Sequence, residues 1–117
     1  MKYMSAAEAV QLINSGDSLY IQGSTSIPEV LSQALADRGN ELKDVTVYAA
    51  FAVGRCEAPY CRPEYNDAFN VKSLFVANNI RRWLADGYGT TIPAFLGEIP
   101  ALFRDGTLPL DAVFLNV

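Results

Sequence analysis

Short apolar runs alternate with stretches of helical periodicity along this sequence. The apolar runs predict five strands, at 18–22, 45–50, 73–77, 89–92 and 111–117. Helical patterns occupy 5–16, 26–39, 78–86 and 97–106. Strands that are apolar on both faces and alternate with helices are typical of a parallel sheet. We therefore expect an α/β fold, with an open, mainly parallel sheet and helices on both faces.

Two of the predicted helices begin with the pattern of a capping box. Ser5 and Glu8 have the required spacing, and so do Ser26 and Glu29. In such a box, the serine oxygen accepts a backbone N–H and the glutamate reaches back to the start of the helix. Pro28 would then lie in the first turn, where its missing N–H costs nothing. The apolar face expected for this second helix consists of Val30, Leu31, Ala34 and Leu35.

The segment 51–71 lacks periodicity and is predicted to be a long loop, a kind of segment that is often functional in a compact domain. The chain as a whole is expected to be one domain, 1–117. Its last strand is apolar, with nothing polar beyond Asn116. Because terminal residues are usually the least packed, we expect this domain to be the front part of a longer, two-domain chain.

Composition narrows the function classes. The net charge is −4, and the nine basic residues are scattered, which argues against a nucleic-acid partner. No apolar run reaches the length of a membrane span, and the first residues follow a helical rather than a signal-peptide pattern. We therefore expect a cytoplasmic protein without a membrane partner. Cys56 and Cys61 alone cannot complete a zinc site, so no metal is expected.

Ligands of open α/β sheets bind beyond the carboxyl ends of the strands. The loop GSTSIP at 23–28 lies at such an end and leads into a helix, whose first turn favours anions. It is neither a dinucleotide fingerprint nor a Walker A loop. The alternative is purely structural, with Ser26 capping the helix and Ser24 and Thr25 forming a turn.

Catalytic groups are scarce in this sequence. It contains no histidine, so it cannot build a Ser–His or Cys–His nucleophile pair. Glu57, Glu64 and Glu98 lie near the predicted strand ends, where each is expected to be solvated or to cap a helix. No catalytic residue is therefore predicted from these residues.

From Ala58 onward the sequence resembles a known family. The segments APYCRPEY (58–65), FNVKSLFVANNIR (69–81) and IPAFLGEIPALFRDGTLPLDAVFLNV (92–117) are similar to the N-terminal domain of the acetyl-CoA hydrolase/transferase family. Within that family they resemble the 4-hydroxybutyrate or butyrate–acetate CoA-transferase branch. Residues 6–35 match the family's opening helix, strand and loop in order and spacing, so the resemblance covers essentially the whole chain.

The resemblance implies an enzyme that moves coenzyme A between acyl groups in a ping-pong reaction. A glutamate of a second, C-terminal domain would attack the acyl-CoA and form an anhydride, then a glutamyl-CoA thioester. Residues 1–117 alone would be inactive. Coenzyme A is a substrate here, and no cofactor is implied. The implied partners are acyl-CoA, a small carboxylate, the C-terminal domain of the same chain and, as one option, a second copy in a homodimer.

The same resemblance implies that loops of this domain form part of the substrate cleft. This loop set consists of Gly23, Ser24, Thr25, Ser26, Pro28, Ala52, Val53, Gly54, Asn78 and Asn79. Family members often have consecutive glycines where this chain has Gly23-Ser24. Two alternatives stay open: a non-catalytic module that binds an anionic metabolite at the same loops, and an interaction remnant that only pairs with a partner.

Overall fold

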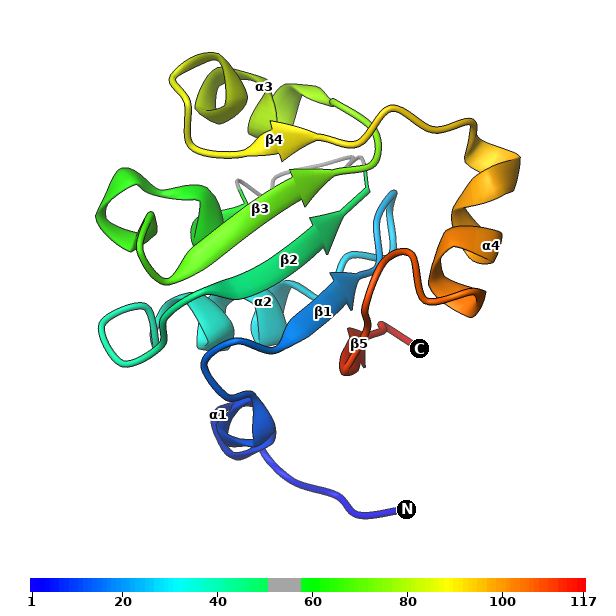
Figure 1. Cartoon of the computed structure of the whole chain (residues 1–117). Helices are drawn as coiled ribbons and strands as arrows, with labels where there is room; N and C mark the ends of the chain where they lie inside the picture. The colour runs from blue at the N-terminus through cyan, green and yellow to red at the C-terminus, as the bar shows by residue number, and fades with distance from the viewer. Residues whose placement is uncertain (51–57) are drawn as a thin grey trace.

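The computed structural model describes residues 1–50 and 58–117. Within them the chain forms a five-stranded sheet in the order β4-β3-β2-β1-β5 (Figure 1). The strands are β1 Ser18–Ile21, β2 Val45–Ala49, β3 Phe69–Ser73, β4 Thr90–Thr91 and β5 Ala112–Phe114. Each neighbouring pair runs parallel. The predicted α/β fold with a parallel sheet is confirmed.

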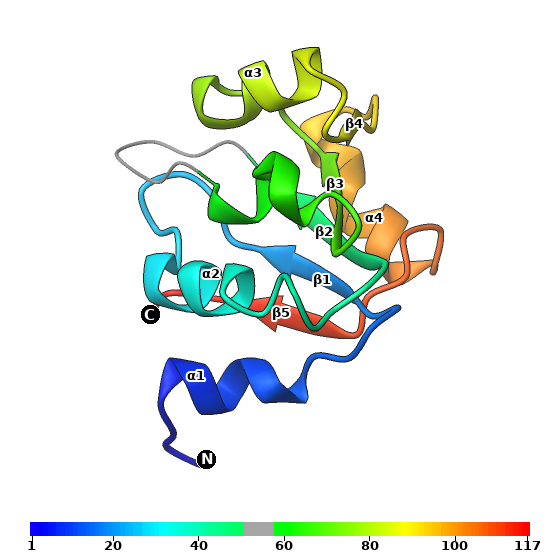
Figure 2. The same ribbon diagram turned by 90° about the vertical axis from the view of Figure 1, so that its left-hand side faces the viewer.

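Helices cover both faces of the sheet. They are α1 Ala6–Ala9, α2 Glu29–Ala36, α3 Asn78–Ala85 and α4 Ile99–Arg104, with 3₁₀ turns at Val10–Leu12, Pro59–Cys61, Pro63–Tyr65 and Leu96–Glu98. Figure 2 shows α2 and the turns near residue 60 on one face and α4 on the other. The chain steps in one direction from β1 to β4 and then returns past β1 to β5. Right-handed crossovers place α2 and α4 on opposite faces for this reason. No helix in the described ranges could span a bilayer.

The alternation of side chains divides the sheet into two unlike faces. Leu19, Val47 and Val71 lie side by side in the ladder and are buried in the main core. Tyr20 and Tyr48 point the other way, as successive residues of a strand must. The ring of Phe103 from α4 packs edge-on against both, with centroids 5.8 and 5.2 Å away. Such edge-to-face contacts are favourable beyond the area they bury, so these rings attach α4 to the second face.

The third strand lies four residues earlier than its apolar run predicted. β3 spans Phe69–Ser73 rather than 73–77, and its residues alternate between buried and partly exposed. Phe75, in the run that looked like the strand, is 56% exposed. The apolar run was misleading because β3 buries one face more than the other, which favours alternation over continuous apolarity. The preceding loop is shorter than 51–71, and its described part contains two 3₁₀ turns.

Only one of the two predicted capping boxes is present. At α1, the Ser5 N–H donates to the Glu8 carboxylate at 2.8 Å, and the Glu8 N–H donates to the Ser5 hydroxyl at 3.3 Å. At α2, the N-cap is Pro28 instead of Ser26, with no side-chain cap. The buried face of the helix also differs from the predicted one. Val30 is 74% exposed, whereas Ser32, Leu35 and Ala36 are buried.

Two polar contacts at the amino ends of the strands fix β5 against β1. The Ser18 N–H donates to the Asp111 carboxylate at 2.8 Å, and the Asp111 N–H donates to the Ser18 carbonyl at 2.7 Å. Tyr48 lies beside this pair. Burial raises the pKa of the Tyr48 hydroxyl, and a hydrogen bond with the Ser18 side chain lowers that pKa in part. The pair sets the register in which the far end of β5 meets the loop after β1.

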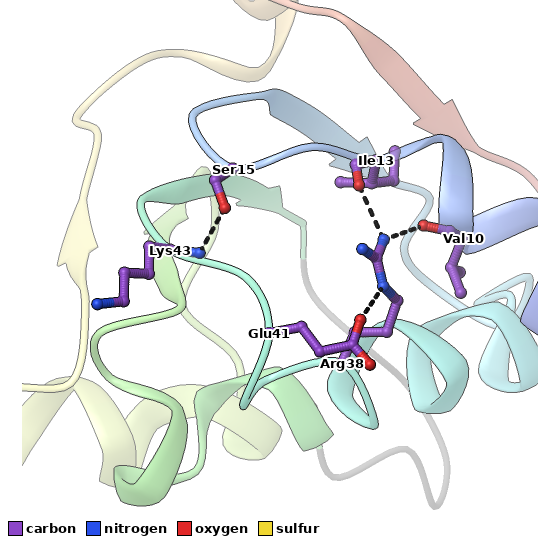
Figure 3. Close-up of polar contacts among 6 residues, drawn as sticks. All are labelled: Val10, Ile13, Ser15, Arg38, Glu41 and Lys43. Carbon is purple, nitrogen blue, oxygen red and sulfur yellow. Dashed lines mark hydrogen bonds and ion pairs between the residues drawn. The ribbon is translucent and has the colours of Figure 1, made fainter.

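Arg38 joins the first helical segment to the end of α2 (Figure 3). Its Nη1 donates to the carbonyls of Val10 and Ile13, the latter at 2.8 Å, and its Nε donates to the Glu41 carboxylate at 3.0 Å. The Arg38 side chain is 14% exposed and that of Glu41 is 62% exposed. The guanidinium therefore supplies a donor to the Ile13 carbonyl and a further donor to the Val10 carbonyl, which also accepts the Ile13 N–H at 3.1 Å.

Replacing Arg38 by methionine is expected to lower the free energy of unfolding by about 2–3 kcal/mol, because two partly buried carbonyls lose a charged donor. Urea unfolding followed by circular dichroism measures the change. The control is Glu41→Gln, which breaks only an exposed ion pair and should cost less than about 1 kcal/mol. Equal losses in the two variants would show that the ion pair, and not the carbonyl contacts, holds this corner together.

Candidate functional site

The strand order reverses between β1 and β5. Successive strands lie on one side of β1 as far as β4, and β5 lies on its other side. In open α/β sheets, the crevice outside the carboxyl ends at such a point is the usual ligand site. A pocket of about 410 Å³ opens here, between the start of α2 and the residues that follow β5. Topology and cavity therefore point to the same place.

The loop after β1 and the end of β5 are joined by hydrogen bonds next to this pocket. The Gln22 N–H donates to the Phe114 carbonyl at 3.0 Å. The Asn116 N–H in turn donates to the side-chain oxygen of Gln22 at 2.8 Å. These bonds hold the segment that contains Leu115 and Asn116 beside the pocket. The residues that line it are Thr25, Ile27, Pro28, Glu29, Val30, Leu31, Leu115 and Asn116.

The residues predicted for the site from the sequence are distributed over the carboxyl edge. Thr25 and Pro28 line the pocket, and Gly23, Ser24 and Ser26 belong to the same loop without lining it. Asn78 and Asn79 begin α3, after β3, and do not line this pocket. Ala52, Val53 and Gly54 lie outside the described residues. The contribution of Leu115 and Asn116 was not predicted, because it depends on the pairing of β5 with β1.

The charge around the pocket differs from that of an anion site. The start of α2 contributes a partial positive charge from its backbone N–H groups. However, Glu29 is the first residue of that helix, and its carboxylate offsets this charge. Among the residues that the structure describes, Glu29 is also the one charged residue in the lining. Within this described part, the pocket wall has no basic side chain of the kind that usually holds a phosphate or carboxylate.

A second group of polar atoms lies along the same edge. The Ser73 hydroxyl, at the end of β3, is fully buried, and the Asn79 Oδ1, at the start of α3, is also shielded from solvent. Neither has a hydrogen-bond partner in the part of the chain that the structure describes. The Ser32 hydroxyl and the Trp83 Nε1 are likewise buried without a hydrogen-bond partner among the described residues. The sequence pattern did not indicate Ser73 as a site residue, because it placed Ser73 at the start of a strand at 73–77. In the structure, Ser73 is the last residue of β3.

The glutamates near the strand ends have structural or solvent-exposed positions. The Glu98 carboxylate accepts the Phe95 N–H at 3.1 Å, which confirms the capping role predicted for it. Glu64 is exposed on the turn Pro63–Tyr65, and Glu57 lies outside the described residues. Over residues 1–50 and 58–117, no group of three potential metal ligands is present.

The model of the acetyl-CoA hydrolase/transferase N-terminal domain matches residues 1–116. The chain belongs to this family. It is 31% identical to the succinyl-CoA:acetate/propanoyl-CoA:succinate CoA transferase of Fasciola hepatica, over 94% of this chain and 23% of that protein. It is 26% identical to the butyryl-CoA:acetate CoA-transferase of Anaerostipes caccae, over 99% of this chain and 26% of the relative.

The fold of a solved relative agrees with this assignment. The crystal structure of RipA from Yersinia pestis superposes with a TM-score of 0.82 at 26% identity. The match covers 96% of this chain and 28% of RipA. The chain thus spans about a quarter of the length of the relatives that it matches. Its family and fold are those expected from the sequence segments at 6–35 and 58–117.

The backbone at Ser24 gives a direct test of the loop conformation. Ser24 has φ of +63°, in the left-handed region that glycine adopts without steric cost. We expect Ser24→Gly to raise the free energy of unfolding by about 0.5–1 kcal/mol, since relief of the Cβ clash exceeds the entropy that glycine adds to the unfolded chain. Thermal unfolding measures the change.

The matched control is Ser26→Gly in the same loop. Ser26 is not among the residues with positive φ. Glycine there gains nothing in the folded state and should lower stability by a similar amount. If Ser24→Gly destabilised the protein as much as Ser26→Gly, the left-handed conformation of Ser24 would be refuted.

Proposed function

We propose that residues 1–117 are the N-terminal part of a longer CoA-transferase, which moves coenzyme A between an acyl-CoA and a small carboxylate such as acetate or 4-hydroxybutyrate. The observation that carries this proposal is the family match over residues 1–116, with relatives that are named CoA transferases. Because this chain spans about a quarter of those relatives, a further domain belongs to the proposal. So do a homodimer and a cytoplasmic location, which rest on the family resemblance and the sequence pattern.

The proposed reaction proceeds through a carboxylate of the further domain. The oxygen of a glutamate there attacks the thioester carbonyl, and CoA leaves as the thiolate. The thiolate then attacks the glutamyl carbon of the anhydride, releasing the first acid and leaving a glutamyl-CoA thioester. An incoming carboxylate reverses these steps and leaves as the new acyl-CoA. The enzyme glutamate is regenerated, so atoms and charge balance without a cofactor.

The role that we propose for the present domain is to position the substrates. Its loops at the carboxyl edge, at Gly23–Pro28, Ala52–Gly54 and Asn78-Asn79, would form one wall of the cleft. The positions of Glu64 and Glu98 support the assignment of the nucleophile to another domain, since one is exposed on a turn and the other caps a helix. Positioning lowers a barrier only when a reacting group is present.

Residues 1–117 alone are therefore expected to show no CoA transfer from an acyl-CoA to acetate. The natural gene product should have roughly four times the mass of 12.8 kDa and should transfer CoA. The two proteins are each incubated with an acyl-CoA and labelled acetate. Product formation is followed by chromatography, and the covalent CoA adduct is located by mass spectrometry of peptides.

The expected adduct lies on a glutamate outside residues 1–117. Turnover by residues 1–117 alone would refute the assignment of chemistry to a further domain. A natural product that ends near residue 117 and binds a carboxylate without transferring CoA would support the binding-module alternative instead.

A further inference from the structure

The two edges of the sheet carry different side chains. One edge is β4, which consists of two exposed threonines (Figure 1). The other edge is β5, which is apolar over Ala112–Phe114 and is followed by Leu115. Proteins usually protect an open edge with polar or charged residues, because an open apolar edge pairs readily with another strand. β4 has this protection, and β5 lacks it.

Exposed apolar surface gathers beside β5 and not beside β4. Leu110, Val113 and Leu115 are 39%, 46% and 54% exposed. The segment 76–94, which contains α3 and β4 and is described throughout, has no large apolar side chain that is exposed. Clustered apolar surface of this kind marks a contact with another segment or molecule.

The backbone of β5 also has free hydrogen-bonding groups on its outer side. The Phe114 carbonyl accepts the Gln22 N–H at 3.0 Å, so the backbone groups of Phe114 point toward β1. Successive residues of a strand point these groups to opposite sides, so the N–H and C=O of Val113 point away from β1. β5 is the last strand in the order, and no strand of the described residues lies beyond it. The outer side of β5 therefore offers a donor and an acceptor to a further strand.

The two faces of β5 are covered unequally. Phe114 is 7% exposed and belongs to the main core. Val113 is in register with Tyr20, whose ring packs against Phe103 of α4, so Val113 lies on the face that α4 covers. It remains about half exposed there because α4 does not extend over it. The missing cover thus lies on the α4 face of the sheet.

The handedness of the crossovers predicts what would cover this face. The chain returns from β4 to β5 across the face that carries α4 (Figure 2). A step from β5 to a strand outside it would continue in the same direction. A right-handed connection in that direction places its helix on the same face as α4, over Val113. One further helix and strand would therefore cover both the exposed side chain and the open backbone.

We propose that the outer edge of β5 is an interface for the part of the natural chain that follows residue 117, which adds a further parallel strand there. This inference rests on the longer protein of the proposed function. The relatives are about four times as long as the present chain, which leaves ample length for such a strand. Two copies related by a two-fold axis would instead pair their β5 strands antiparallel, whereas every described pair of this sheet is parallel.

The test compares the two edges by proline substitution in the natural, longer protein. Proline has no N–H, and it is tolerated where that group faces solvent but not inside a sheet. Val113→Pro removes the outward N–H of β5. Thr91→Pro is the matched control: the Ile92 N–H donates to the Ser73 carbonyl at 2.9 Å, so the Thr91 N–H points away from β3. Val113→Ala and Thr91→Ala correct for the loss of each side chain.

We expect Val113→Pro to lower the thermal unfolding midpoint by at least about 5 °C more than Val113→Ala does, while Thr91→Pro stays within about 2 °C of Thr91→Ala. Hydrogen exchange in the wild-type protein gives a second measurement, which does not require a variant to fold. Resolved to single amides, exchange should be at least about a hundredfold slower at Val113 than at Thr91. Tenfold dilution of the protein should leave this difference unchanged.

Exchange at Val113 as fast as at Thr91, or equal effects of the two prolines, would overturn the proposal. Exchange at Val113 that becomes faster on dilution, as light scattering shows a dimer dissociating, would assign the edge to a second copy and overturn it as well. Neither measurement depends on catalysis. A longer protein without CoA transfer but with slow exchange at Val113 would contradict the proposed function alone, and an active protein with fast exchange there would contradict the interface alone.

Discussion

The parallel pairing of β1 with a neighbour on each side constrains the whole arrangement. Leu19 is in register with Val47 of β2 and with Ala112 of β5, so one buried residue sets the alignment of three strands. A shift of one residue would turn every core side chain of a strand toward the other face. The two hydrogen bonds between Ser18 and Asp111, one to the Asp111 carboxylate and one to the Ser18 carbonyl, oppose such a shift on the β5 side. The position of the pocket depends on this register.

The sequence carried enough information for the fold class and for most elements, but not for β3 or the start of α2. β1 and β2 were placed within a residue because their buried side chains form continuous apolar runs. β3 was misplaced because its strand alternates while the neighbouring apolar run leads into α3. At α2, the Ser26–Glu29 spacing fitted a capping box, yet the helix begins after Pro28. Residues 26 and 27 belong to the loop in the structure, so the spacing of Ser26 and Glu29 did not determine where the helix begins.

The sequence could predict the edge of the sheet at which the candidate site lies, but not all of the residues that line the pocket there. Placing ligands at the carboxyl ends of strands requires only the α/β alternation, and it correctly led to the loop that contains Thr25 and Pro28. Leu115 and Asn116 reach the same cavity through a contact between Gln22 and Asn116. These residues are far apart in the sequence, and no local pattern encodes their meeting. Glu29 was interpreted as a capping residue, whereas in the structure it lines the pocket.

Stability and proposed function lie at opposite ends of the sheet. At the amino ends, polar groups are paired: Arg38 satisfies the Val10 and Ile13 carbonyls, and the Lys43 N–H donates to the Ser15 hydroxyl (Figure 3). At the carboxyl ends, Ser24 adopts a left-handed conformation, α2 lacks a side-chain cap, and the Ser73 hydroxyl is unpaired among the described residues. Proteins tolerate such local costs mainly where a site requires them. Backbone strain occurs at both edges, because Asp44, which precedes β2, also has a positive φ of 55°. The two edges therefore differ in the pairing of these polar side chains rather than in backbone strain.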